Sequence, residues 1–572
     1  MKHSHIKLLA ASLSIALCAP VIAGKNLVLI GGGNSACASD GSSSCTSTVT
    51  WSANARKEDL FKLTDTQYNA LRARTDLFTS AQITKFASLT RNTQYNFTDF
   101  DDMLYSKLGA TVYDSLSNDQ YYAVLNYSEV AQLANGNTIE VNYSATNAHN
   151  VAYTNRFIQL AESNVGTGNA VIGVVTASTA DGYFSYKFNE KFYKAAGAKE
   201  VVWIPVDTAW RKALGNCGTL QAKVETEYGN FDVARRYTDL FNKQMAACQS
   251  PATTVQADLN RITGIHFVGG NQAKHKEAFI NANGTDTAEM AILRTRVNNG
   301  SVVYSGTSAG TAVAANVPMI TGGDSYNALV YGTVAAPGTG LRAFDLTVDN
   351  GGGLKLFNYG AIDTHFGQRG RQGRIVRQAL DAGQNFAYGV DENTALVVTN
   401  ADTSSALMTA IGEGGVYLFD LRNKIVSTDS TTGRKKILDV LASYLTKGDT
   451  YAPYTEVFTK ASNKTLLNGV EYYSSAMSAT KDIFSSPNNT APYAVAYTKR
   501  AQDFCNSRVT TVNDTTWESK ARATTAMPYP VQYQIYFDKI TATKCYNVSG
   551  AGRNADAASY FKMSVDFIPR NQ

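Results

Sequence analysis

The sequence predicts an α/β fold: a three-layer, mostly parallel sheet that carries an inserted segment and a β-rich C-terminal module. Short apolar runs alternate with helical stretches in residues 25–35 and 165–425, as parallel strands buried on both faces do. Residues 35–165 interrupt this alternation with a stretch rich in Asn, Thr, Tyr and Ala, which indicates the insertion. Beyond residue 425, apolar and polar residues alternate with period two, as in half-buried antiparallel strands.

Seven apolar runs are expected to form the strands of the sheet. In chain order they are Lys25–Gly33, Asn169–Thr176, Glu200–Val206, Gly264–Val268, Ser301–Ser305, Gly389–Thr399 and Gly415–Asp420. A helix is expected between the second and third runs, at Tyr186–Ala196. In the C-terminal module, the alternating strands are expected at Tyr529–Phe537 and Ala558–Phe567.

The start of the chain has the pattern of a secretory signal peptide. Basic residues lead into the apolar run Leu8–Cys18, and small residues precede an expected cut after Ala23. This run is too short to cross a bilayer, which needs about 20 residues. We therefore expect a secreted protein, extracellular or periplasmic, with no membrane partner. Its parts would be a signal peptide (1–23), a catalytic α/β domain (24–425) and the C-terminal module (426–572).

The charge of the chain is mild. Its 572 residues have a formal net charge of +5, and loss of Lys2 and Lys7 with the leader would lower this to +3. Nucleic-acid-binding proteins are usually much more basic, so no nucleic-acid partner is expected. The length exceeds what one hydrophobic core serves and indicates two or three domains. Whether the chain forms a homodimer stays open.

The cysteines indicate disulfides. Outside the leader there are six, which cluster along the chain as three local pairs: Cys37 and Cys45, Cys217 and Cys248, and Cys505 and Cys545. An even count in an exported chain is typical of disulfides, although six cysteines allow 15 pairings. None has the spacing of a metal site, so no metal is expected. The Gly31–Gly33 turn lacks the motifs of nucleotide-binding loops, so no cofactor is expected either.

The pentapeptide Gly306–Gly310, Gly-Thr-Ser-Ala-Gly, follows a β-branched and aromatic run and precedes small helix formers. A strand, a sharp turn and a helix in this order form a nucleophile elbow with Ser308 at its apex. The N–H of Ala309 is then one donor of an oxyanion hole, and the glycine turn at Gly270 is a second possible source. A glycine-rich turn with a surface serine is the alternative interpretation.

A serine nucleophile needs a base, which is usually histidine. Four histidines lie outside the leader. His149 lies in an Asn/Ala-rich part of the insertion, His266 inside a buried strand, and His275 in the first turns of a helix. His365 follows an apolar stretch, and reactive groups in open α/β sheets gather at the carboxyl ends of strands. We therefore predict His365 as the base.

The third member of a triad holds the histidine in its tautomer. From the residues alone, Asp324 and Asp363 are both candidates, and Asp391 or Glu392 is less favoured. Separately from the triad, Gln272 follows the Gly269–Gly270 turn and is a candidate to present its amide to the substrate.

Three arginines, Arg369, Arg371 and Arg374, follow the predicted base. A solvated basic helix start is the simpler explanation. Arginine is unfavourable at a helix N-terminus, however, and guanidinium groups bind carboxylates through two parallel hydrogen bonds. The cluster is therefore expected to bind carboxylates or main-chain acceptors.

Together and in order, six segments resemble the cyanophycinase branch of the serine peptidase family that also includes aspartyl dipeptidases. They are LIGGG at Leu29–Gly33, VVTASTADGY at Val174–Tyr183, GIHFVGGNQ at Gly264–Gln272, SGTSAG at Ser305–Gly310, IDTHFGQRGRQGR at Ile362–Arg374 and GVDENTALVV at Gly389–Val398.

The resemblance implies a fold akin to class I glutamine amidotransferases and hydrolysis of cyanophycin, a polyaspartate with arginine on each side chain, to β-Asp-Arg dipeptides. It also implies Ser308 as the nucleophile, His365 as the base and Asp324 as the third member. The substrate pocket it implies consists of Gln272, Asp363, Arg369, Arg371 and Arg374.

The chain departs from the family pattern at Asn271, where Asp is usual, and at Thr364, where Gln is common. Three other functions stay open: another exopeptidase or dipeptidase of the same family, an α/β-hydrolase esterase, and a secreted binding protein without catalysis. An esterase shares the Gly-x-Ser-x-Gly motif but has no need of the arginines.

Overall fold

The computed structural model describes residues 24–33, 35–132, 138–476, 482–484, 495–516, 531–552, 554 and 557–571. The expected signal peptide lies outside these residues. No helix in the described ranges has the length and apolar character that crossing a membrane requires.

A nine-stranded sheet forms the centre of the described structure, in the order β19-β18-β14-β13-β1-β7-β6-β4-β5. Five neighbouring strands are parallel: β1 (Lys25–Ile30), β7 (Val303–Thr307), β6 (Gly264–Phe267), β4 (Val171–Val175) and β5 (Glu200–Trp203). The other four continue the sheet in antiparallel pairs: β13 (Thr394–Ala401), β14 (Leu407–Gly412), β18 (Thr450–Ala452) and β19 (Val457–Thr459). The expected parallel segment is therefore present, and antiparallel strands extend it.

Helices pack on both faces of this sheet, because successive side chains of a strand point to opposite faces. The His266 ring of β6 lies 5.4 Å from Tyr193 of α7 (Gly182–Ala195), between centroids, and also contacts α6 (Ala148–Glu162). Its neighbour Phe267 lies 5.2 Å from Phe279 of α13 (Gln272–Phe279), also between centroids. Helix, sheet and helix thus form three layers here.

A second, larger sheet has the main order β11-β12-β15-β17-β24-β22-β21. These strands are β11 (Ala361–Asp363), β12 (Phe386–Val390), β15 (Gly415–Asp420), β17 (Lys435–Thr446), β24 (Ser559–Arg570), β22 (Gln532–Asp538) and β21 (Thr511–Thr515). Added to its edge and ends are β16 (Ile425–Thr428), β20 (Lys464–Leu466) and β23 (Lys544–Val548). The C-terminal region is β-rich, as expected.

Each of the two sheets contains strands from both sides of the predicted domain boundary at residue 425. β17 pairs with β15 over six residues on one side and with β24 on the other. β18 and β19 extend the nine-stranded sheet instead. Residue 425 therefore does not mark a sheet boundary, and the C-terminal strands complete sheets that begin earlier in the chain.

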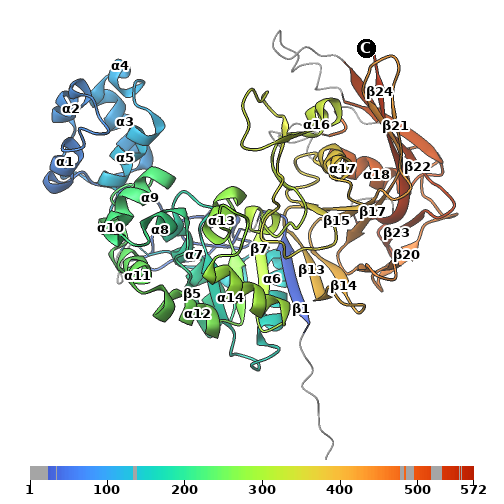
Figure 1. Ribbon diagram of the computed structural model, residues 1–572, viewed down its shortest axis with the longest axis horizontal. Coiled ribbons are helices and arrows are strands. Elements are labelled where there is room, and N and C mark those ends of the chain that lie inside the picture. The colour runs from blue at the N-terminus through green and yellow to red at the C-terminus, as the bar shows by residue number, and fades with distance from the viewer. Residues whose placement is uncertain are drawn as a thin grey trace, which may run out of the picture.

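The predicted insertion contains a helical module with a core of its own (Figure 1). Its helices are α1 (Asp65–Arg72), α2 (Ser80–Lys85), α3 (Phe97–Leu108), α4 (Ala110–Tyr113) and α5 (Asn118–Ser128), beside the short pair β2 (Leu60–Phe61) and β3 (Tyr95–Asn96). In Figure 1 the module stands beside α9 (Leu220–Tyr228) and α10 (Val233–Arg236), at the end of the molecule opposite the second sheet. The last helix of the insertion, α6, instead covers the central sheet.

The remaining elements connect these parts. They are α8 (Thr208–Ala213), α11 (Thr238–Gln249), α12 (Val255–Arg261), α14 (Ala288–Asn298), α15 (Ala309–Ala312), α16 (Ser325–Tyr331), α17 (Gln372–Asp381) and α18 (Ala496–Cys505), with a small sheet of β8 (Met319–Gly322), β10 (Leu346–Asp349) and β9 (Thr333–Ala335).

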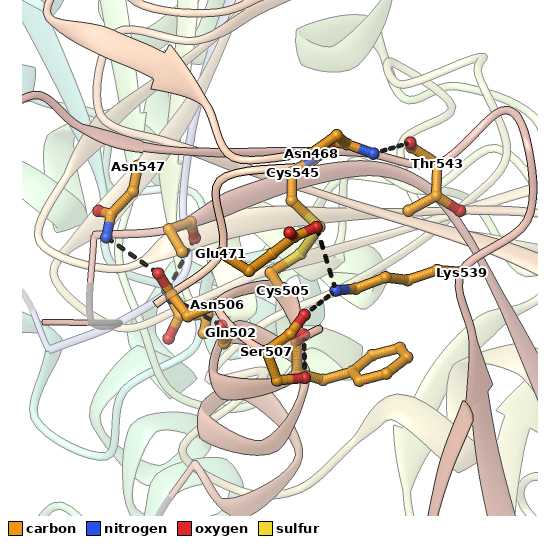
Figure 2. The surroundings of a disulfide bond; sticks show 12 residues. Asn468, Glu471, Gln502, Cys505, Asn506, Ser507, Lys539, Thr543, Cys545 and Asn547 are labelled. Atoms are coloured by element: carbon orange, nitrogen blue, oxygen red, sulfur yellow. Dashed lines mark hydrogen bonds and ion pairs between the residues drawn. A yellow bond between two sulfur atoms is a disulfide. The ribbon is translucent and has the colours of Figure 1, made fainter. Parts of the chain in front are cut away.

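Three disulfides join the cysteines in the local pairs expected from the sequence. Figure 2 shows the bond between Cys505, at the end of α18, and Cys545 of β23. Hydrogen bonds surround it: Asn468 Nδ2 donates to the Thr543 carbonyl at 2.9 Å, and the Cys545 N–H donates to Asn468 Oδ1 at 2.9 Å. The bond therefore fixes helix α18 to the second sheet.

Candidate functional site

Ser308 lies at the sharp turn between β7 and α15, as the elbow motif predicts. Its backbone has φ 52° and ψ −109°, a conformation that is strained for a residue with a side chain. A methyl group on Gly306 would lie 2.2 Å from the Gly310 carbonyl oxygen, and one on Gly310 would lie 2.0 Å from the Phe267 carbonyl oxygen. The two glycines are therefore sterically required, and the Ser308 N–H donates to the Ile30 carbonyl at 3.0 Å.

The structure brings His365 to Ser308: the imidazole Nε2 lies 2.6 Å from Ser308 Oγ. His365 follows β11, which belongs to the second sheet, whereas Ser308 follows β7 of the first. The His365 N–H donates to the Gly31 carbonyl at 2.8 Å. Gly32 lies directly against the ring, since a methyl group there would be 2.2 Å from His365 Cε1. The glycine turn after β1 therefore makes room for the imidazole.

Glu392 is the carboxylate on the other side of His365. Its Oε1 lies 2.6 Å from His365 Nδ1, and its own N–H donates to Gln368 Oε1 at 2.9 Å. This corrects the expectation for Asp324, whose Oδ1 accepts the Asn327 N–H at 2.7 Å and so caps α16. Asp324 is a helix cap in the structure, and Glu392, less favoured from the sequence, has the position of a third triad member.

The charges around His365 set its protonation. Burial lowers the pKa of His365, and the nearby Arg369 and Arg371 lower it further, while Glu392 opposes them. The hydrogen bond from His365 lowers the pKa of Glu392. The imidazole is therefore neutral near pH 7, and the carboxylate at Nδ1 favours the tautomer that leaves Nε2 free to accept a proton.

Asp391, the neighbour of Glu392, holds the loop in place. Its carboxylate accepts the N–H of Gly367 at 2.7 Å, the N–H of Gly415 at 3.1 Å and the hydroxyl of Tyr444 at 2.7 Å. Burial raises the pKa of Asp391 to about 6. Gly367 lies two residues after His365, and Glu392, which contacts His365, follows Asp391 directly. The Asp391 carboxylate therefore holds together the two loops that carry His365 and Glu392.

Backbone donors for an oxyanion are arranged around Ser308. Ala309 is the first residue of α15, where backbone N–H groups have no acceptor within the helix. On the facing loop, a methyl group on Gly269 would lie 3.5 Å from Ser308 Cβ. Gly269 therefore lies next to the serine, whereas the sequence pattern pointed to its neighbour Gly270. Gly270 has φ 134° and packs against the Ser178 carbonyl.

The predicted acidic pocket residue Asp363 turns out to hold arginines. It accepts from Arg374 Nε at 2.6 Å and Nη2 at 2.8 Å, from Arg371 Nη1 at 3.1 Å and from the Thr364 N–H at 2.8 Å. These cations keep the pKa of the buried Asp363 carboxyl below its usual range. Asp363 therefore positions Arg371 and Arg374, and its carboxylate is already occupied.

The three arginines differ in the hydrogen bonds and ion pairs that their guanidinium groups form. Arg374 is 4% exposed and also donates to the Gly323 carbonyl. Arg371 donates through Nη1 to the Thr364 carbonyl at 2.7 Å, and burial lowers its pKa to about 9. Arg369 is half-buried, and its backbone N–H donates to the His365 carbonyl at 3.1 Å, but its guanidinium makes no hydrogen bond or ion pair with another residue in the described ranges. Arg369 is thus the arginine with a guanidinium available to a ligand.

Gln272 begins α13, and its Nε2 donates to the Ile320 carbonyl at 2.8 Å. The other histidines lie elsewhere. Burial lowers the pKa of His266 to about 3 and that of His275 to about 4, as for neutral core histidines. His149 lies in the first turn of α6 rather than in a loop. Within the described ranges, no group of His, Cys, Asp or Glu is arranged to hold a metal ion.

Comparisons with known proteins point to peptidases. No family model matches the chain. The cyanophycinases of Trichormus variabilis and of a Nostoc species are each 28% identical over 229 residues, which is 40% of this chain and 66% of each relative. The cyanophycinase of Geminocystis herdmanii is 26% identical over 231 residues, 40% of this chain and 74% of the relative.

The chain therefore matches just under two thirds of the length of the first two relatives. A solved peptidase from an acI-B1 Actinobacterium is 14% identical, with a TM-score of 0.31 over 53% of this chain and 91% of its own. At identities of 26–28%, the partial matches to cyanophycinases support a peptidase family for the chain.

Proposed function

We propose that this protein is a serine peptidase in which Ser308 is the nucleophile, His365 the base and Glu392 the residue that orients the base. The observation that carries the proposal is the continuous chain of contacts from Ser308 Oγ to His365 Nε2 and from His365 Nδ1 to Glu392, each 2.6 Å long. Such a chain is the arrangement that activates a serine hydroxyl for acyl transfer.

In the proposed reaction, Ser308 Oγ attacks a peptide carbonyl carbon while its proton passes to His365 Nε2. The oxyanion of the tetrahedral intermediate accepts from the Ala309 N–H and from the glycine turn at Gly269. His365 then gives its proton to the leaving amine, which breaks the peptide bond and leaves an acyl group on Ser308. Water attacks this ester with His365 as base, which releases the acid and restores the hydroxyl.

We further propose cyanophycin as the substrate, cut to β-Asp-Arg dipeptides. Two observations support it: the relatives bear the name cyanophycinase, and the positive charges of Arg369 and Arg371 are close enough to His365 to lower its pKa. Arg369 is available for a substrate carboxylate, and Arg371, held by Asp363, has donors besides Nη1. Since Asp363 is engaged, another acid must receive the substrate guanidinium. The leader pattern and the disulfides fit cleavage of polymer outside the cell.

The test is to incubate the purified protein with insoluble cyanophycin and to look for β-Asp-Arg by mass spectrometry. Ser308→Ala and His365→Ala should abolish dipeptide release, because they remove the nucleophile and the base. Ser301→Ala, at the start of the same strand region, should leave it unchanged. Release of no dipeptide by the native protein, together with turnover of simple esters, would contradict the assignment and favour an esterase.

A further inference from the structure

A cavity of about 440 Å³ lies between the helical module and the α/β core. From the module, Phe97 of α3 and Asp119 and Tyr122 of α5 line it. From the core, Asp181 after β4 and Asn230 after α9 line the opposite wall. The insertion and the core therefore enclose a site together that neither encloses alone.

The core wall carries a buried amide without an acceptor. Asn230 is 4% exposed, and its Oδ1 accepts from Arg236 Nη1. Because a guanidinium only donates, this contact fixes the orientation of the amide and directs Nδ2 elsewhere. Asn230 Nδ2 has no hydrogen-bond partner in the described structure. Buried polar groups are normally paired, so this N–H is an unsatisfied donor in a residue of the cavity wall.

Among the described residues, some acids that line the cavity form ion pairs, whereas Asp119 does not. Arg236 pairs with Glu129 and, at 2.8 Å, with Asp181, so both of these carboxylates in the deeper wall have a cationic partner. Asp119 is exposed and forms no ion pair with any cation in the described ranges. Its carboxylate leaves a negative charge at the mouth of the cavity.

Two large aromatic side chains stand next to this charge. Phe97 is 47% exposed and Tyr122 is 52% exposed, and both rings line the cavity, so each has surface available to a ligand there. A guanidinium group stacks on aromatic faces and pairs with carboxylates, and it does both better than an ammonium group.

We propose that this cavity binds an arginyl unit of the polymer substrate, at a distance from the bond being cut. The inference rests on the proposed function. The guanidinium would pair with Asp119 and stack on Tyr122 or Phe97. This cavity would supply a negative charge for the substrate guanidinium, which the positively charged arginine cluster at His365 cannot supply.

One loop connects the cavity to the nucleophile. Ser178 Oγ donates to the Gly269 carbonyl at 2.7 Å, and the Asn271 N–H donates to the Ser178 carbonyl at 2.9 Å. Three residues later, Asp181 lines the cavity. The loop that contacts the glycine turn beside Ser308 therefore also lines the cavity. A polymer of repeating arginyl units would occupy both places, whereas a short peptide would occupy only the place at Ser308.

The experiment compares the double variant Asp119→Asn, Tyr122→Ala with a matched control, Asp114→Asn, Tyr105→Ala, whose positions lie on the same module outside the cavity. For cyanophycin, the KM of the first should rise about tenfold with kcat unchanged, since a charge pair and a stacking contact are lost. For a synthetic segment of two β-Asp-Arg units, neither KM nor kcat should change. The control should behave as the native protein does with both substrates.

A second measurement separates this inference from the proposed function. Ser308→Ala protein should sediment with insoluble cyanophycin, and Ser308→Ala combined with Asp119→Asn, Tyr122→Ala should sediment about tenfold less strongly. Binding that depends on the cavity without any hydrolysis by native protein would overturn the peptidase and keep the cavity site. Hydrolysis with an unchanged KM in the double variant would overturn the cavity site alone. Equal competition by poly-L-lysine and poly-L-arginine would overturn the preference for arginine.

Discussion

His365 Nδ1 and Glu392 Oε1 lie 2.6 Å apart although 27 residues separate them in the chain. They meet because β11 and β12 are parallel neighbours, with Asp363 opposite Gly389, so the loops that follow the two strands leave the sheet side by side. The proposed base and its carboxylate are therefore positioned by one pair of strands.

This contact predicts that Glu392→Gln lowers kcat by about 10²- to 10⁴-fold, since an amide no longer stabilises the protonated imidazole or fixes its tautomer. Asp324→Asn is the matched control, because asparagine also caps helices and Asp324 does not contact His365. Its kcat should stay within about twofold of the native value. Steady-state kinetics on cyanophycin measures both, and a severe loss in the Asp324 variant would reverse the assignment.

The close approach of Gly32 to the imidazole makes a second prediction. Gly32→Ala places a methyl group where the His365 ring lies, at a backbone φ of 135° that other residues rarely adopt. Displacement of the base by about 1 Å should cost about 10²-fold in kcat. Gly41→Ala, with no atom within 4 Å of the added carbon, should be neutral. Equal activity of the two variants would show that the ring does not need this space.

The lowered pKa of His365 predicts the acid side of the pH profile. Activity needs the neutral imidazole, so kcat/KM should fall as the pH drops through the pKa of His365, which lies below its ordinary value of about 6.5. Arg369→Gln removes a positive charge that disfavours the imidazolium. Its acid limb should therefore move to higher pH, whatever its effect on substrate affinity. A limb that stays in place or moves to lower pH would contradict the proximity of Arg369 to the base.

The disulfides predict an order of stability effects. Replacing both cysteines of the Cys505–Cys545 pair by serine opens a loop with a separation of 40 residues, against 8 residues for Cys37–Cys45. Loop-closure entropy then predicts a loss in the free energy of unfolding of about 4 kcal/mol for the first and about 2.5 kcal/mol for the second. Thermal unfolding of the two double variants should show the larger decrease in Tm for the C-terminal pair.

The sequence predicted the parallel strands and the serine elbow well, because both depend on local patterns. Apolar runs identified β1, β4, β5, β6 and β7, and the need for Gly306 beside Ser308 follows from a steric contact within the turn itself. His365 was found by elimination among four histidines.

Other features depend on which strands pair, and the sequence does not encode this in a local pattern. The preference for Asp324 over Glu392 followed from motif position, whereas the choice is made by the register of β11 against β12. The engagement of Asp363 by Arg374 follows from the packing of α17 against β11. The single sheet expected for Ser308 and His365 is two sheets, because β12 pairs with β15 and β11 rather than with β13.

Ser308 and its proposed base His365 therefore follow strands of different sheets, and the chain between them runs through many intervening residues. Mild heat or denaturant that loosens the junction of the two sheets would interrupt proton transfer while each sheet still keeps its own strand pairing. Catalytic activity would then disappear before the circular dichroism of the backbone changes, and hydrolysis would report how closely the two halves of the molecule are joined.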